Sequence, residues 1–320
     1  MTEQRFSLKG GRDFDLHCVL WLPEGKPKAV IQVIHGMTEH MGRYADFAAF
    51  MTENGIAVAG FDLRGHGVNP GDSRCASFGE KGWQYSLEDM HCFAEHLDST
   101  LADVPRFMLG FSLGSFLLRE YINVYNDKIA GAVIMGTGHQ PGAVLSAMVA
   151  IVNGQVKKAG IDGTTPLVQK LSFDTYNSKF KPNRTTADWL CADNSELDKY
   201  IADPLCRESI SAGLFRDLLM AMKGTGSATA YENVDKTVPV MLISGSDDPV
   251  GDMGKGVSAV AKAMEKAGIQ DKTTLLIAEA RHDLLHEYAG GQAQSAMTDI
   301  LQWIEKRISP KDHICGLFYL

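Results

Sequence analysis

The sequence predicts an α/β protein in which helices cover both faces of a mostly parallel β-sheet. Strand-like and helix-like segments alternate through most of the 320 residues, an order that is typical of parallel sheets. Two strand-like segments, 29–34 and 106–111, are continuous apolar runs, as expected of strands buried on both faces. Residues 138–232 interrupt the alternation with helical patterns but no convincing buried strand. We therefore expect a core of residues 1–137 and 233–320 with a helical cap at 138–232.

The elements before this insertion follow from local patterns. Residues 13–22 alternate between polar and apolar side chains like a strand, and "LKGGR" before them predicts a hairpin turn. A helical pattern at 43–55 ends at Gly55, a residue typical of helix C-termini. Another, at 86–97, opens at Ser86 with acidic residues in its first turn. The remaining expected elements are strands at 29–34, 56–62, 106–111 and 129–136 and a helix at 113–123.

Helical patterns dominate the insertion, and the alternation resumes after it. Apolar residues share one helical face at 144–160 and again at 213–222. An insertion of this length at the end of a strand lies where a lid over a site would lie. The alternative is a second helical subdomain that packs only its own core. After the insertion we expect strands at 238–245 and 273–279 and helices at 253–267 and 291–307.

Composition and charge exclude several classes of protein. Hydrophobic residues make up 45% of the chain and charged residues 22%, which is ordinary for a globular protein. The net charge of −8 is spread along the chain and argues against nucleic acid or anionic membrane as a partner. The N-terminus has no apolar signal-peptide segment, and the most apolar window, 143–152, is about half of the roughly 20 residues that span a bilayer. Six cysteines without a Cys-x-x-Cys pair indicate reduced thiols, so we expect a cytoplasmic protein without stable membrane insertion.

The stretch "GFSLG" at 110–114 contains the candidate nucleophile, Ser112. It joins the expected strand 106–111 to the expected helix at 113. Glycines at such a junction permit the tight, strained turn that exposes a serine hydroxyl at the edge of a sheet. The alternative is a serine that caps the helix.

A serine hydroxyl becomes nucleophilic when a histidine, oriented by a carboxylate, takes its proton. Catalytic groups of open parallel sheets gather at the carboxyl ends of strands. The histidines in such positions are His35, His66, His139 and His282. His282 follows the last expected strand, which agrees with the chain order of nucleophile, acid and base. His286, four residues later, is expected to be an exposed or packed helix histidine.

The acid should lie at a strand end between Ser112 and His282. The stretch "SGSDDPV" at 244–250 offers both Asp247 and Asp248 there. The residues alone do not choose between these two carboxylates.

The oxyanion of an acyl-transfer reaction needs two backbone donors. One should be the N–H of Leu113, at the positive end of a helix. The other should come from the loop after an earlier strand, where Gly36 lets the chain turn and Met37 offers its N–H.

Two further clusters of polar residues suggest functions other than this one. His35, Glu39 and His40 suggest a metal site, but three residues rather than two separate the first histidine from the glutamate, and they begin with glycine. We therefore expect no metal. The set Asp62, Arg64 and His66 is more simply a buried ion pair that shapes a loop.

With these residues placed, the chain resembles the α/β-hydrolase superfamily, in the branch of monoacylglycerol lipases, bacterial lysophospholipases and serine aminopeptidase-like hydrolases. The resemblance spans nearly the whole chain, and it implies an eight-stranded sheet and Asp248 as the orienting acid. One departure is Asp283, where relatives often carry glutamate. The stretches that carry the resemblance are "HGMTEHMGRY" (35–44), "FDLRGHG" (61–67), "GFSLG" (110–114), "DWLCAD" (188–193), "YIADPLC" (200–206), "GSDDPV" (245–250) and "ARHDLLHE" (280–287).

The resemblance implies a serine hydrolase that cleaves carboxylic esters through an acyl-enzyme, without a cofactor. Monoacylglycerols, lysophospholipids or short and medium acyl esters are the expected substrates, because apolar cap helices suggest an acyl channel. The alternatives are a peptidase that removes N-terminal residues and a binding protein without activity. A peptidase of that kind must neutralise a substrate ammonium, and the acidic residues of the cap lie mainly in polar stretches. Those residues are Asp174, Asp188, Asp193, Glu196, Asp198 and Asp203.

Overall fold

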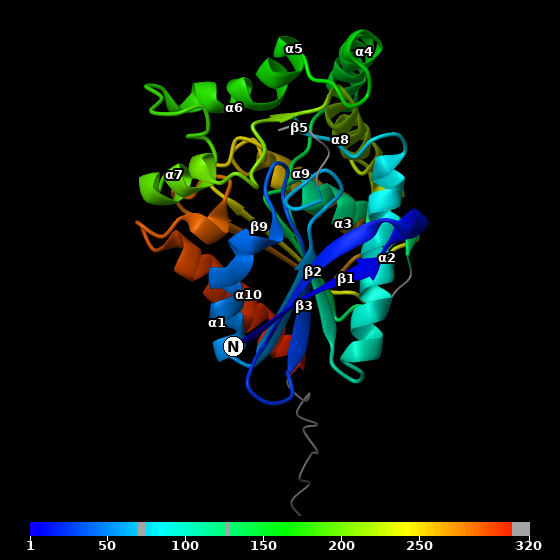
Figure 1. Ribbon diagram of the computed structural model, residues 1–320, viewed down its shortest axis with the longest axis vertical. Coiled ribbons are helices and arrows are strands. Elements are labelled where there is room, and N and C mark those ends of the chain that lie inside the picture. Colours follow the sequence, from blue (N-terminus) through cyan, green and yellow to red (C-terminus); the bar gives the residue numbers. More distant parts are fainter. Residues whose placement is uncertain (70–74, 126–127, 309–320) are drawn as a thin grey trace, which may run out of the picture.

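An eight-stranded sheet forms the centre of the molecule (Figure 1). The computed structural model describes residues 1–69, 75–125 and 128–308. The strand order is β1-β2-β4-β3-β6-β7-β9-β10. The strands are β1 (Thr2–Lys9), β2 (Asp15–Leu22), β3 (Ala29–Ile34), β4 (Ile56–Phe61), β6 (Arg106–Phe111), β7 (Gly131–Met135), β9 (Val240–Gly245) and β10 (Lys272–Ile277).

Strand direction brings distant parts of the chain together at one edge of the sheet. β2 runs antiparallel to both of its neighbours, β1 and β4. The pairs β3–β4, β3–β6, β6–β7, β7–β9 and β9–β10 are parallel. The carboxyl ends of these parallel strands therefore lie at the same edge, and the mostly parallel eight-stranded sheet is confirmed.

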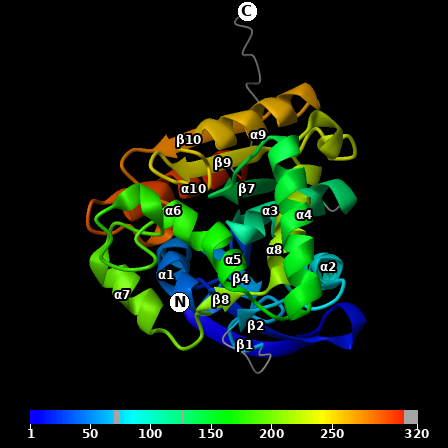
Figure 2. The same ribbon diagram turned by 90° about the horizontal axis from the view of Figure 1, so that it is seen from above.

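Helices cover both faces of the sheet (Figure 2). The helices α1 (Ala45–Glu53) and α10 (Gln292–Ile308) pack on one face, in a core that includes Phe47 and Trp303. The helices α2 (Gly82–Thr100), α3 (Leu113–Val124) and α9 (Lys255–Lys266) pack on the other. The central strands β3, β4, β6, β7 and β9 are buried along their whole length, because helices cover both of their faces.

The residues between β7 and β9 form further helices, and α4, α5 and α6 lie at the top of Figure 1. They are α4 (Gly142–Ala159), α5 (Pro166–Gln169), α6 (Thr175–Asn177), α7 (Asn194–Ala202) and α8 (Ala212–Gly224). One short strand was not expected here: β8 (Ser209–Ile210) pairs in parallel with β5 (Cys75–Ala76). A two-residue strand has no periodicity that a sequence pattern could reveal. Short helical turns occupy η1 (Gly11–Asp13), η2 (Met41–Tyr44), η3 (Lys170–Asp174), η4 (Ser178–Phe180), η5 (Ala228–Tyr231) and η6 (Leu284–His286).

The sequence-based expectations differ from the structure at the beginning of the chain. No strand bounds were predicted for β1, an edge strand whose side chains are mostly exposed and therefore show no apolar pattern. Helix α2 begins at Gly82 rather than at Ser86, which is buried inside the helix and donates its hydroxyl to the Gly82 carbonyl at 2.8 Å. The hairpin turn before β2 is confirmed, since β1 and β2 pair from Thr2–Leu22 to Lys9–Asp15.

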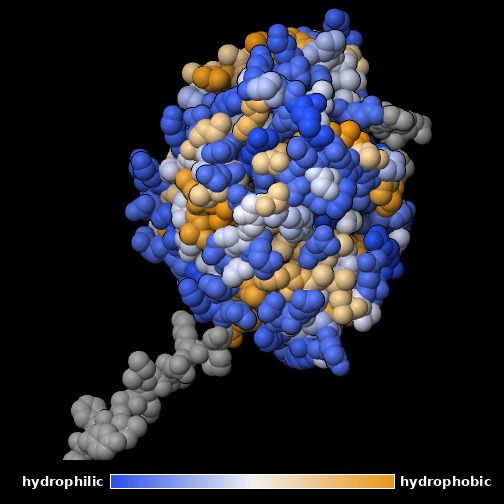
Figure 3. Space-filling model, turned by 90° about the vertical axis from the view of Figure 1, so that its left-hand side faces the viewer, coloured by the Kyte–Doolittle hydropathy of each residue, from blue (hydrophilic) through white to orange (hydrophobic). Residues whose placement is uncertain are grey.

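None of the helices in the described parts of the chain combines the length and the apolar composition needed to cross a bilayer. Figure 3 shows the side on which α1, α7 and α10 lie in Figure 1. Hydrophilic side chains cover most of this face, and apolar ones form small separate groups.

Candidate active site

Ser112 lies in the tight turn between β6 and α3. Its backbone has φ 50° and ψ −114°, a conformation that non-glycine residues rarely adopt. The flanking glycines are sterically required, because a Cβ at Gly110 would lie 2.3 Å from the Gly114 carbonyl oxygen. A Cβ at Gly114 would lie 2.0 Å from that of Ile34. The Ser112 side chain makes no capping hydrogen bond to α3, so the capping alternative is wrong and the hydroxyl is available for another partner.

That partner is His282, in the loop after β10. Its Nε2 lies 2.8 Å from Oγ of Ser112. The ring is buried between Phe111 and Trp189, whose ring centroids are 5.0 Å and 5.1 Å away. A histidine held in this way can accept the serine proton.

Asp248 lies on the other side of this histidine. Its Oδ1 is 2.9 Å from Nδ1 of His282, although this contact does not have the direction of a hydrogen bond. Such contacts commonly tighten only when substrate is bound. Asp248 is fully buried, and its oxygens accept hydrogen bonds from the Val250 N–H at 2.8 Å and the Ser244 hydroxyl at 2.9 Å. Asp247 is exposed, and among the described residues its side chain accepts only from the neighbouring Ser246 hydroxyl, at 3.0 Å.

The two expected oxyanion donors are available. Met37 borders the same small cavity as Ser112, and Leu113 follows Ser112 directly. Within the described ranges, neither the Met37 N–H nor the Leu113 N–H donates to another group. Both can therefore donate to an oxygen that is bound beside Ser112.

His35 orients the peptide that carries the Met37 N–H. Its Nε2 accepts from the Leu63 N–H at 2.9 Å, so the proton of the neutral ring is on Nδ1. Nδ1 then donates to the Gly36 carbonyl at 2.7 Å. In a trans peptide the N–H of residue 37 points away from that carbonyl, so the contact fixes the direction of the donor. Burial lowers the pKa of His35 and keeps the ring neutral. The position of His35 after a strand was the one sequence feature that pointed toward this role.

The other histidine candidates lie apart from Ser112. His66 is buried, and its Nδ1 lies 2.8 Å from the Arg64 carbonyl. His139 does not border the cavity at Ser112. The expected ion pair around His66 is only partly right, because Arg64 pairs with Asp89 at 2.6 Å rather than with Asp62.

Asp62 shapes its loop through backbone contacts. It accepts from the Met41 N–H at 2.8 Å and from the Val68 N–H at 2.9 Å. It therefore connects the loop after β4 to the segment at η2.

The contacts of residues 35–40 do not support the metal site that this segment suggested. His35 and Glu39 each bind backbone groups, and His40 instead lies near Asp203 and Cys206, with donor atoms within 4.8 Å of one another. The Gly42 N–H donates to Nδ1 of His40 at 3.1 Å, so Nε2 carries the proton and donates to Asp203 at 2.8 Å. That arrangement leaves Nε2 no lone pair for a metal ion and links the core to the insertion.

Side chains from the insertion close over Ser112. The cavity beside Ser112 has a volume of only about 20 Å³, room for about one water molecule. Phe173, Trp189, Leu190 and Tyr200 separate it from a second cavity of about 150 Å³.

The apolar faces of α4 and α8 do not line either cavity among the described residues. Leu145 and Val152 of α4 and Leu214 and Leu218 of α8 share one apolar core with α3. Val149 packs against this core, so these helix faces do not form the acyl channel that the apolar cap helices had suggested.

The carboxylates near Ser112 all have partners. Glu39 and Asp283 border the small cavity. Both oxygens of Glu39 accept hydrogen bonds, from Gly36, Tyr44 and Arg43. Both oxygens of Asp283 face Arg43 or His286.

The acidic residues of the insertion also have structural roles, and not all are solvated as expected. Asp188 is buried and accepts three hydrogen bonds from Arg184 and Thr185. Asp193 caps α7, Glu196 pairs with Lys199, and Asp198 pairs with Arg184. None of these borders the cavity at Ser112.

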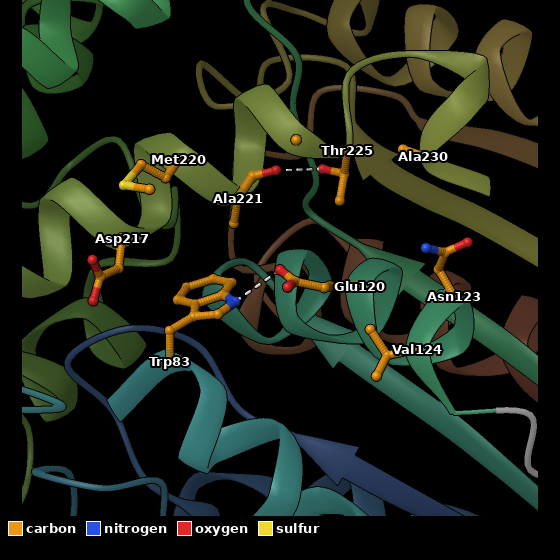
Figure 4. Close-up of a pocket in the computed structure, with 10 residues that line it drawn as sticks. Trp83, Glu120, Asn123, Val124, Asp217, Met220, Ala221, Thr225 and Ala230 are labelled. Atoms are coloured by element: carbon orange, nitrogen blue, oxygen red, sulfur yellow. Dashed lines mark hydrogen bonds between the residues drawn. The ribbon is translucent and has the colours of Figure 1, made fainter. Parts of the chain in front are cut away.

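A larger cavity of about 380 Å³ lies between α2, α3 and α8 (Figure 4). The indole of Trp83 donates to Glu120 at 2.8 Å on one side of it, and Asp217 and Met220 lie on another. Its described lining contains no serine, cysteine or histidine. The nucleophile and base therefore belong to the small cavity under the insertion.

Comparisons with known proteins identify the family of the chain. A model of the family described as serine aminopeptidase, S33, matches residues 25–289. Human monoglyceride lipase is 30% identical over 308 residues, covering 91% of this chain and 87% of that protein. The mouse monoglyceride lipase is 27% identical over 295 residues, covering 92% and 88%. A carboxyl esterase from Bacillus coagulans, 23% identical, shares the fold with a TM-score of 0.86, covering 96% of this chain and 99% of that one. The chain therefore belongs to the serine aminopeptidase S33 family of α/β-hydrolases, in the branch that includes the monoglyceride lipases.

Proposed function

We propose that this protein hydrolyses carboxylic esters, with monoacylglycerol-like or other acyl esters as substrates. The observation that carries the proposal is the 2.8 Å contact between the Ser112 hydroxyl and His282, at a strained turn. The similarity to monoglyceride lipases supports an acylglycerol-like substrate.

In the proposed reaction, Ser112 Oγ attacks the acyl carbonyl as His282 Nε2 takes its proton. The buried Asp248 stabilises the imidazolium that forms. The N–H groups of Met37 and Leu113 bind the oxyanion. His282 then protonates the leaving alcohol, and the acyl group remains on Ser112.

Water completes the cycle. His282 removes a proton from a water molecule, which attacks the acyl-enzyme and releases the acid. We propose that residues 138–232 act as the cap over this chemistry, since Phe173, Trp189, Leu190 and Tyr200 stand between Ser112 and the second cavity. An acyl chain that displaces these side chains gains roughly 0.8 kcal/mol for each methylene it buries.

The contacts around Ser112 favour esters over peptides with a free N-terminus. A substrate ammonium needs a carboxylate, and the described carboxylates of the small cavity are already bound to Arg43, His286 and neighbouring groups. The four side chains toward the second cavity are apolar or aromatic and suit a hydrocarbon chain instead.

A substrate panel tests the proposal. We expect kcat/KM to rise from p-nitrophenyl acetate to esters of medium chain length and monoacylglycerols to be hydrolysed. Aminoacyl p-nitroanilides should be poor substrates. Faster cleavage of the anilides than of any ester would contradict the proposal and favour the peptidase.

A further inference from the structure

A buried cluster of charges connects the two loops that hold the proposed catalytic groups. Glu39, Arg43 and Tyr44 come from the loop after β3 and from η2, and Asp283 and His286 come from the loop after β10. Residues 43 and 283 are 240 positions apart in the chain. The proposed chemistry gives none of these five residues a role.

Glu39 holds the loop of the proposed oxyanion donor. Its side chain is 1% exposed, and its Oε1 accepts from the Gly36 N–H at 2.5 Å and from the Tyr44 hydroxyl at 2.8 Å. Gly36 precedes Met37. A shift of the Glu39 carboxylate would therefore move the peptide that carries the Met37 N–H.

Asp283 holds the loop of the proposed base, because it follows His282 directly. Its N–H donates to the Leu190 carbonyl of the insertion at 2.7 Å. Its Oδ1 lies 2.8 Å from Nδ1 of His286. Nε2 of that histidine lies 3.1 Å from the Arg43 carbonyl oxygen. Because both of these partners are acceptors, the imidazole satisfies both contacts only when both nitrogens carry protons.

Arg43 is the link between the two loops. One guanidinium nitrogen donates to Oε2 of Glu39, and another donates to Oδ2 of Asp283 at 2.7 Å. The side chain is only 10% exposed and lies over the ring of Tyr200, at 5.0 Å from its centroid. Burial disfavours the charge of Asp283, but His286 and Arg43 outweigh it and hold the pKa of this carboxyl well below its ordinary value. The planar guanidinium is suited to two carboxylates at once, whereas a lysine would be a single point charge.

We propose that Arg43 is a positioning residue, which by pairing with Glu39 and Asp283 fixes the Met37 N–H relative to the imidazole of His282. The proposal rests on the proposed function, because it assumes that both groups act on one substrate. Misplacing a donor or a base in an active site lowers the rate of the chemical step more than substrate binding.

Arg43→Met tests the link on p-nitrophenyl acetate, whose small acyl group needs little of the cap. We expect kcat to fall on the order of 10²-fold, as when one oxyanion donor is lost, and KM to stay within about twofold, as when an interaction made only in the transition state is lost. Arg43→Lys should restore only part of the rate. The matched control is Arg106→Met, which removes another buried arginine paired with Asp98 at 2.8 Å, at the end of β6 that is remote from Ser112. The control should lower the melting temperature without lowering kcat.

Combined variants separate a shared link from unrelated structural damage. Glu39→Gln and Asp283→Asn should each lower kcat. The kcat of the triple variant Glu39→Gln/Arg43→Met/Asp283→Asn should be no more than about threefold below the kcat of the most impaired single variant. The triple variant also leaves no unpaired carboxylate in the cluster, so it remains measurable if Arg43→Met alone fails to fold. A kcat of Arg43→Met or the triple variant within about twofold of wild type would overturn the proposal, as would losses that multiply. If instead Ser112→Ala keeps full esterase activity, the proposed function itself fails.

Discussion

The two neighbouring aspartates provide a sharp test of the site, because they differ in burial but not in chemistry. Asp248 is fully buried beside His282, whereas Asp247 is exposed. The change to asparagine keeps the shape of either side chain and removes its charge. We expect Asp248→Asn to lower kcat strongly and Asp247→Asn to change it by less than about twofold.

The contacts of Asp248 set the size of the effect. Its Oδ1 faces both the Val250 N–H at 2.8 Å and Nδ1 of His282 at 2.9 Å, and its Oδ2 faces the Ser244 hydroxyl. In the asparagine variant the amide oxygen must face Val250, because an amide NH₂ cannot accept a hydrogen bond. His282 would then keep its native tautomer and lose only the negative charge that stabilises the imidazolium. Two unit charges about 4 Å apart interact by about 4 kcal/mol at an effective dielectric constant of ~20, which corresponds to a loss of about 10³ in kcat.

The assay compares kcat of both variants and wild type on one p-nitrophenyl ester. Thermal melting of each protein serves as the control for folding. A loss of about 10⁴ for Asp248→Asn would indicate that the histidine tautomer changes after all. Equal losses for the two variants, or a larger loss for Asp247→Asn, would refute the assignment of the acid.

Three further predictions follow from packing and protonation. Gly114→Ala should abolish folding or lower the unfolding free energy by several kcal/mol, because its Cβ would lie 2.0 Å from the Ile34 carbonyl oxygen. Gly154→Ala, in open space on α4, should instead raise the unfolding free energy by roughly 0.5–1 kcal/mol. Urea denaturation measures both variants, and similar effects of the two changes would contradict the close approach at Gly114. Trp189→Ala removes part of the wall between the two cavities, so kcat/KM for decanoyl relative to acetyl esters should change at least several-fold, while an unchanged ratio would exclude this wall as the acyl path. Burial lowers the pKa of both His35 and His66, so below about pH 6.5 the unfolded chain takes up a proton on each of these residues that the folded chain does not. The contribution of these two histidines should therefore lower the unfolding free energy by up to ~2.7 kcal/mol per pH unit as the pH decreases. Urea titrations at pH 7, 6 and 5 that give equal unfolding free energies would contradict the last point.

Regular, buried elements could be predicted from the sequence because burial leaves a continuous apolar pattern. The strands expected at 29–34 and 106–111 have those bounds in the structure. Exposed or very short elements leave no such pattern: β1 pairs on one side only, and β8 has two residues. Ser86 resembled a helix cap although its hydroxyl bonds back to Gly82 inside α2.

The parts of the site that lie next to strand ends could also be predicted. Ser112 and His282 follow β6 and β10, and the structure brings them to 2.8 Å. The choice between Asp247 and Asp248 depends on which carboxylate is buried, and the residues themselves do not determine this. The contact of Arg43 with Asp283 depends on how two distant loops pack, and no local pattern contains that information.

Covalent labelling of Ser112 tests the central claim most directly. Wild-type protein is treated with a fluorophosphonate and digested, and the modified peptide is identified by mass spectrometry, with Ser112→Ala treated in parallel. We expect a single adduct on the peptide that contains Ser112, no adduct in the variant, and a loss of ester hydrolysis of up to ~10⁶-fold. An adduct that persists in Ser112→Ala, or a variant that still hydrolyses esters at the wild-type rate, would contradict a nucleophilic role for Ser112.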